Sequence, residues 1–143
     1  GNDAKTRASL RNELQDKRFA ELREGVWMRP DNVSLDLGDD ISSRVRALRA
    51  QDDQPAQLAA ELWDLEGWAK TGSRLLAEMA QADDMPGRFV IAAAMVRHLL
   101  TDPVLPGELL PAGWPGAELR TAYHDFAAEL VARRDEPELM EAT

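Results

Sequence analysis

The chain contains no cysteine. This absence excludes disulfide bonds, thiolate metal sites and cysteine nucleophiles together. Long apolar runs are also missing, since none approaches the roughly 20 residues that a helix needs to cross a bilayer. No stretch has the charged start and short apolar core of a signal peptide. We therefore expect a cytoplasmic protein with no membrane-spanning segment.

The chain has too few basic residues for its own surface to bind nucleic acid broadly. The 143 residues carry 17 lysines and arginines against 26 aspartates and glutamates, for a net charge of −9. Broad contact with a phosphate backbone needs clustered positive charge. The charge is also uneven: residues 1–60 hold 10 basic and 11 acidic side chains, whereas residues 61–143 hold 7 and 15. Two regions with different roles is the simplest interpretation.

Sequence signatures of common catalytic sites are lacking as well. There is no glycine-rich phosphate loop, no Gly-x-Ser-x-Gly turn and no His-Glu-x-x-His motif. His98 and Asp102 are four residues apart, but a metal usually needs three or four ligands, and the spacing supplies no third. We therefore expect no enzyme, no metal and no cofactor. A pocket in which His98, Asp102 and Tyr123 converge would revive an enzymatic hypothesis.

What is present, 44% apolar and 30% charged residues, is typical of a folded chain with one domain or two small ones. Residues 3–18 predict a helix with one sparse apolar stripe. FAELREGVWMRPDN, residues 19–32, predicts a β-hairpin around Arg23-Glu24-Gly25. In residues 41–50, Ile41, Val45 and Leu48 fall on one helical face. The polar segment QDDQPAQ, residues 51–57, marks a boundary, so we predict domains 1–57 and 58–143.

The second region predicts helices. From residue 58 to about 82 the apolar period is 3.6, which indicates one continuous stripe: Leu58, Leu62, Leu65, Ala69, Gly72, Leu76 and Met79. RFVIAAAMVRHLL, residues 88–100, is apolar on nearly every side and predicts a helix surrounded by protein. Residues 115–134 predict a last amphipathic helix whose face holds Leu119, Tyr123, Phe126 and Leu130. Residues 135–143 are expected to fray.

TDPVLPGELLPAGWPG, residues 101–116, connects the last two expected helices and is unusually stiff and apolar. Four of the eight prolines lie here. Each proline fixes its own φ and pushes the preceding residue towards an extended conformation. Burial of each large apolar side chain between them stabilises by about 1.5–3 kcal/mol. We call this segment the strap and predict that it is rigid and buried against the helices.

Two further features leave alternatives open. Trp63 and Trp114 are expected in the core, whereas Trp68 lies off the main stripe and is expected to meet another domain or chain. Arg44, Arg46 and Arg49 form a small basic cluster. It is either a solvated helix face or a site for an anionic ligand.

The strap and the hairpin together resemble one family. HLLTDPVLPGELLPAGWPGAELRTAYHDF, residues 98–126, is similar to the C-terminal signature of the PaaX family of bacterial transcriptional repressors. FAELREGVWMRPDN is similar to the hairpin of that family's middle domain, and the two matches run in the family's order. The resemblance covers about residues 10–126.

The resemblance implies an α+β fold: a truncated ferredoxin-like middle piece, with a β-hairpin plus helices, followed by an all-α C-terminal helical domain. The family's N-terminal winged helix and the opening strand of its middle domain are missing, so we expect a fragment that contacts DNA only through the missing N-terminal domain. Members of the family are dimeric repressors of aromatic catabolic operons, and phenylacetyl-CoA releases the namesake from DNA. One departure is that Trp68 and Gly72 stand where a small residue and an aromatic are expected.

We therefore expect the effector-sensing and dimerising portion of such a repressor, with an aryl-CoA or aromatic acid as effector and a second copy as partner. The alternative is a purely structural dimerisation module without a small-molecule ligand. Arginine suits the phosphates of a CoA thioester. The candidate effector-binding residues are Trp27, Arg29, Arg44, Arg46, Arg97, His98, Arg120 and Tyr123. The resemblance assigns to the strap signature Asp102, Pro103, Leu105, Pro106, Leu109, Leu110, Pro111, Trp114 and Pro115.

Overall fold

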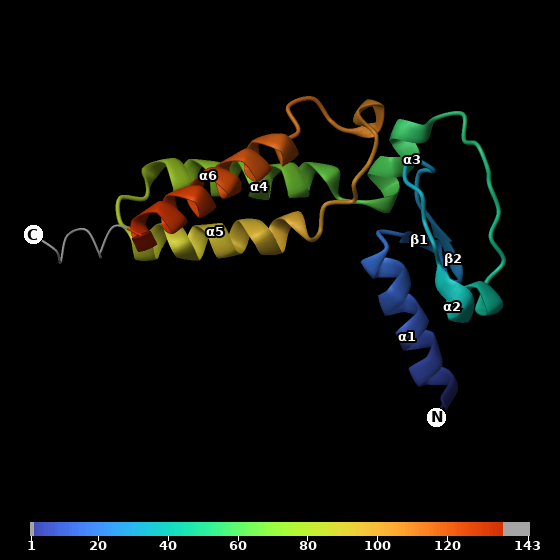
Figure 1. Cartoon of the computed structure of the whole chain (residues 1–143). Helices are drawn as coiled ribbons and strands as arrows, with labels where there is room; N and C mark the ends of the chain where they lie inside the picture. Colours follow the sequence, from blue (N-terminus) through green and yellow to red (C-terminus); the bar gives the residue numbers. More distant parts are fainter. Residues whose placement is uncertain (1, 136–143) are drawn as a thin grey trace, which may run out of the picture. The chain divides into compact units, whose positions relative to one another are not determined.

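The structure is a computed structural model and describes residues 2–135. It is an α+β arrangement of one two-stranded hairpin and helices, as the sequence predicts (Figure 1). The elements are α1 (Asn2–Asp16), β1 (Ala20–Arg23), β2 (Val26–Met28), α2 (Gly38–Arg44), α3 (Pro55–Leu62), α4 (Leu65–Gln81), α5 (Met85–Leu99), the 3₁₀ turn η1 (Gly107–Leu109) and α6 (Gly116–Asp135).

The chain forms two compact units, which are described separately. The hairpin unit comprises residues 1–65 and 103–110, and the helical unit comprises residues 66–102 and 111–143. These units are not the same segments as the predicted domains 1–57 and 58–143, because α3 and the middle of the strap pack with the hairpin. The division at residue 57 stays a prediction.

In the hairpin unit, β1 and β2 pair in antiparallel fashion, with Ala20 opposite Met28 and Glu21 opposite Trp27. Gly25 makes the turn with φ +80°, a conformation that glycine adopts without strain. The hairpin prediction is confirmed. α3 packs on β1 and on η1. The buried apolar side chains come from α1, the hairpin, α2, α3, the start of α4 and the strap: Leu14, Ala20, Ile41, Ala59, Leu65 and Leu105.

The helix predicted over residues 41–50 is wrong in its second half. α2 ends at Arg44, and Val45 is extended, with φ −132° and ψ 157°. Leu48 is therefore not on a helical face with Ile41, and it is 82% exposed. The apolar spacing fits a helix, but of its three apolar residues only Ile41 is buried, so burial does not stabilise a longer helix.

In the helical unit, α4, α5 and α6 lie alongside one another (Figure 1). Their shared core holds Trp68 and Leu75 from α4, Met95 from α5 and Leu119 from α6. Burial of side chains of this size stabilises the unit by about 1.5–3 kcal/mol each. The predicted face of α6 is confirmed, because Leu119 and Phe126 are buried and the other two members are half-buried.

Three predictions for this region are wrong. The continuous helix over residues 58–82 is interrupted at Trp63, which is extended with φ −130° and ψ 144°. Trp68 is not an outward-facing residue: it is 8% exposed and belongs to the core. The helix over residues 88–100 is not surrounded within the described chain, because Phe89 is 55% and Val90 65% exposed. Trp63 and Trp114, expected in the core, are half-buried, and Trp114 packs against the core of the helical unit as expected.

Asp84 caps the N-terminus of α5. The side chain of Asp84 accepts a hydrogen bond of 2.9 Å from the backbone N–H of Gly87, which caps the helix N-terminus. The predicted fraying of residues 135–143 lies outside the described residues, apart from Asp135 at the end of α6.

Candidate functional site

The strap is divided between the two units. Residues 103–110 belong to the hairpin unit, whereas the flanking residues belong to the helical unit. Asp102, Pro103, Leu105 and Pro115 are buried. The other members of the family signature are half-buried: Pro106, Leu109, Leu110, Pro111 and Trp114. The prediction of a buried strap is confirmed only in part, because Val104 is 37% exposed and residues 107–108 and 112–113 are also exposed. The strap links two units rather than crossing one, and its rigidity stays a prediction.

The start of the strap is fixed to the helical unit by an ion pair. Asp102 has a side chain that is only 4% exposed, and its carboxylate accepts a hydrogen bond from the guanidinium of Arg120 on α6. Such charge-assisted bonds are about twice as strong as neutral ones. Arg120 is 48% exposed, so its own desolvation cost is small. This arginine, a candidate for effector binding, has a structural partner.

Trp68 is stacked between two other rings. His98 lies 4.2 Å and Trp114 4.5 Å from it, centroid to centroid, and both pairs are near-parallel. Two rings this close cannot share one face of the indole, so they cover opposite faces. The indole N–H donates to the hydroxyl of Thr101 at 3.0 Å and to the carbonyl of His98 at 3.2 Å.

His98 is fixed in one tautomer by this arrangement. Its Nε2 lies 2.8 Å from the carbonyl oxygen of Trp68. A carbonyl can only accept, so Nε2 carries the proton and donates. The ring thereby joins α5 to α4. His98 and Asp102, which could have served as an acid–base pair, each bond to a different partner.

Gly72 explains the departure from the family pattern at Trp68 and Gly72. A Cβ at this position would lie 2.8 Å from Cγ of Pro115 and 2.9 Å from Cδ1 of Leu119. The strap and α6 therefore pack directly against the backbone of α4. One turn earlier, Trp68 supplies the large ring.

On the hairpin side, Arg29 and Asn32 hold the strap residue Val104. The carbonyl of Val104 accepts from the side-chain amide of Asn32 at 2.9 Å and from the guanidinium of Arg29 at 3.4 Å. Arg29 also donates to the carbonyl of Lys17 at 2.9 Å. Burial, and secondarily the positive charge of Arg18, lowers the pKa of Arg29. Arginine nevertheless keeps its charge in proteins.

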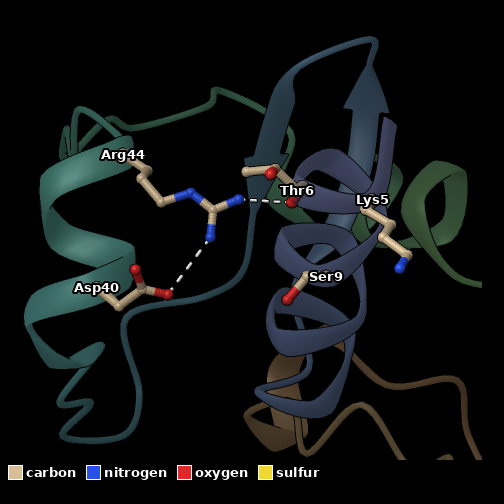
Figure 2. Close-up of a pocket in the computed structure, with 5 residues that line it drawn as sticks. All are labelled: Lys5, Thr6, Ser9, Asp40 and Arg44. Carbon is tan, nitrogen blue, oxygen red and sulfur yellow. Dashed lines mark hydrogen bonds and ion pairs between the residues drawn. The ribbon is translucent and has the colours of Figure 1, made fainter. Parts of the chain in front are cut away.

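Arg44 lies in a shallow, open depression of about 630 Å³ in the hairpin unit (Figure 2). The other lining residues are Lys5, Thr6, Ser9 and Asp40. The guanidinium donates to the carbonyl of Thr6 and contacts Asp40 at 3.4 Å. Figure 2 shows Lys5 pointing away from Arg44. The arginine thus joins α2 to α1, and the carboxylate beside it is unfavourable for an anionic ligand.

The remaining candidate residues are dispersed. Trp27 is half-buried, with the guanidinium of Arg11 6.0 Å from its ring centroid. Tyr123 packs beside the core of the helical unit. Arg46 and Arg97 are exposed, and no ion pair ties either one to another described residue.

Sequence reasoning missed Asn32 and Thr101, and it singled out Trp68 and Gly72 without predicting their contacts. Pro30-Asp31-Asn32 indicated only a strand end, and Thr101 only the start of the strap. The available signal was a glycine one turn after a tryptophan, because residues four apart on a helix lie on the same face.

Among residues 2–135, no three histidine, aspartate or glutamate side chains gather closely enough to hold a metal ion. In the same part of the chain, no helix is both long and apolar enough to cross a membrane.

The fold and the strap define a helical domain joined to a β-hairpin unit by a proline-rich connector. A family model described as the PaaX-like protein C-terminal domain matches residues 63–136, more than half of the chain. The chain therefore belongs to the family of PaaX-like proteins.

One solved structure is also similar, the uncharacterized protein Rv0674 from Mycobacterium tuberculosis. It is 66% identical, with a TM-score of 0.90, and the match covers 96% of this chain and 59% of that chain. The chain thus spans about three fifths of the length of its structural relative. No curated protein matches the chain.

Proposed function

We propose that this chain is the effector-sensing and dimerising portion of a PaaX-like bacterial transcriptional repressor of aromatic-compound catabolism. The observation that carries the proposal is the strap, which lies in the family-matched region and has buried residues in both units. Because residues of the strap are buried in both units, a conformational change in either unit should alter the conformation of the strap. The chain has no strongly basic surface segment of its own, so DNA contact is assigned to a winged helix outside it.

The proposed mechanism is a shift between two arrangements of the repressor. A ligand that binds one arrangement better than the other increases its population. In a dimer, this change alters the spacing of two DNA-reading helices relative to two half-sites and releases the operator. The chain supplies binding energy for the ligand and performs no bond-making step.

An aryl-CoA thioester or an aromatic acid is the proposed effector. Of the candidate arginines, Arg29, Arg44 and Arg120 already hydrogen-bond within the chain. Arg46 in the hairpin unit and Arg97 in the helical unit are exposed, and each is a separate candidate for the phosphates of a CoA thioester. Trp27 and Tyr123 are the candidate aromatic contacts, and His98 keeps a structural bond.

Thermal melts against a ligand panel test the proposal. The panel is phenylacetyl-CoA, benzoyl-CoA, free CoA, phenylacetate and benzoate. A ligand at a hundred times its Kd adds about 2.7 kcal/mol of stability. This gain raises the melting temperature by several degrees in a chain of this size. A rise with one aryl-CoA and none with free CoA supports the proposal. No rise with any member contradicts it.

The second candidate function is a structural dimerisation module, and the outer face of α5 favours it. Phe89, Val90 and Leu100 are 55%, 65% and 68% exposed and lie on one side of the helix. Exposed apolar side chains that share a face indicate an interaction surface. Sedimentation equilibrium tests this function. Val90→Asp should dissociate a dimer that uses this face, whereas Ala80→Asp on the exposed side of α4 should not.

A further inference from the structure

Neighbouring residues at the start of the strap are held by different units. Asp102 pairs with Arg120 of the helical unit. Two residues later, the carbonyl of Val104 accepts hydrogen bonds from Arg29 and Asn32 of the hairpin unit. Only Pro103 separates the two attachments. If either attachment moves, the backbone torsion angles of residues 102–104 must therefore change.

Val104 is strained in this position. Its φ is +55°, in the left-handed region that β-branched residues strongly avoid. Of the four other described positions with positive φ, three are glycine, namely residues 25, 38 and 113, and the fourth is Arg18, which is not β-branched. Strain of this kind persists only where surrounding contacts enforce it, and it concentrates at switch regions. The two hydrogen bonds to the carbonyl of Val104 are among the contacts that enforce it.

The backbone torsion angles of the residues around Val104 are restricted. Any change in backbone conformation at the start of the strap therefore occurs mainly at Val104. Pro103 has a fixed φ, and Leu105 is restricted by Pro106. Val104 precedes no proline. It relaxes to an extended conformation only if its carbonyl turns away from Asn32 and Arg29. The strap thus has a held state with strain and a released state without it.

We propose that Val104 is a strained latch that couples the Asp102–Arg120 ion pair of the helical unit to the strap segment held by the hairpin unit. The proposal needs no effector, so it stands or fails independently of the proposed function. In the held state, the backbone N–H of Leu109 donates to Pro106 at 3.0 Å and that of Leu110 donates to Gly107 at 3.1 Å. These two amides report on the strap.

Hydrogen–deuterium exchange of the Leu109 and Leu110 amides tests the latch. Val104→Gly removes the strain of the held state, so exchange should slow by about tenfold. Asn32→Ala removes the better hydrogen bond, so exchange should accelerate by about tenfold. Asn12→Ala, on the exposed side of α1, is the matched control and should change nothing. The double variant Val104→Gly/Asn32→Ala should return towards the wild-type rate.

Coupling is tested from the other unit. Arg120→Met should accelerate exchange at Leu109 and Leu110, although Arg120 lies in α6, whereas Arg74→Met on exposed α4 should not. Unchanged strap exchange in Arg120→Met, with faster exchange confined to the helical unit, would overturn the coupling. The latch itself would be overturned if exchange at Leu109 and Leu110 did not slow in Val104→Gly. It would also be overturned if exchange did not accelerate in Asn32→Ala.

Discussion

Trp68 and His98 hydrogen-bond to each other in both directions. The indole N–H of Trp68 donates to the carbonyl of His98 at 3.2 Å, and Nε2 of His98 donates to the carbonyl of Trp68 at 2.8 Å, while the two rings stack at 4.2 Å. Each side chain thus satisfies the other residue's backbone. The pair joins the first turns of α4 to the last turn of α5, next to the start of the strap.

Replacing Trp68 by phenylalanine should destabilise the helical unit by about 1–3 kcal/mol. Phenylalanine keeps an aromatic ring but removes the indole N–H that donates to the carbonyl of His98 and to the hydroxyl of Thr101. The carbonyl of His98 keeps the hydrogen bond from the Thr101 hydroxyl at 2.6 Å, so the loss comes from the indole bonds and the smaller ring. Urea unfolding followed by circular dichroism measures the loss. Trp63→Phe is the control, because Trp63 is half-buried outside this stack. Equal losses in the two variants would show that the hydrogen bonds contribute nothing specific.

Gly72→Ala should destabilise the chain by about 1–3 kcal/mol, although alanine is the better helix former. The added methyl group would meet Pro115 and Leu119 at under 3 Å, and overpacking has a cost of this size. Gly107→Ala is the matched control. Its Cβ would meet nothing within 4 Å, so a neutral or slightly stabilising effect is expected. A stable Gly72→Ala variant would mean that the strap does not pack against α4 as described.

Removing Arg120 should cost more than removing an ordinary surface arginine. Arg120→Ala leaves the carboxylate of Asp102 buried and without its guanidinium partner, and we expect a loss of about 1–3 kcal/mol. Arg74→Ala breaks the exposed Arg74–Glu78 pair, whose N–O distance is 3.8 Å. Exposed helix pairs contribute about 0.3–0.5 kcal/mol. Chemical unfolding of both variants gives the comparison, and similar losses would contradict a special role for the buried pair.

The parts of the fold that local chemistry determines could be predicted from the sequence. Gly25 between two apolar segments indicated the hairpin, and the prolines of the strap indicated a connector that is buried in part. Which residues of α4 face the core could not be predicted, because the apolar period is continuous from Leu58 and gives no sign that a helix ends before α4. The break at Trp63 shifts the phase and brings Trp68 into the core. Over residues 58–82, the local sequence does not distinguish one continuous helix from two successive helices with the same apolar period.

The candidate site was predictable in its residue types but not in their partners. Arginines were selected because a guanidinium suits a phosphate. In the folded chain, Arg29 and Arg44 donate to backbone carbonyls, and Arg120 to a carboxylate. A guanidinium is equally suited to each of these acceptors, so the choice depends on tertiary contacts. Arg46 and Arg97 stay candidates for the ligand because they are exposed.

Direct titration of phenylacetyl-CoA and benzoyl-CoA into this chain by calorimetry is the most direct test of the central claim. We expect one of the two thioesters to bind more tightly than free CoA or the matching aromatic acid, because both parts of the ligand contribute contacts. Arg46→Ala and Arg97→Ala are made as separate variants because the two residues belong to different units. One of them should weaken that binding at least tenfold, whereas Lys70→Ala on exposed α4 should leave it unchanged. Absence of binding by both thioesters at millimolar concentration would contradict an effector-sensing role for this chain.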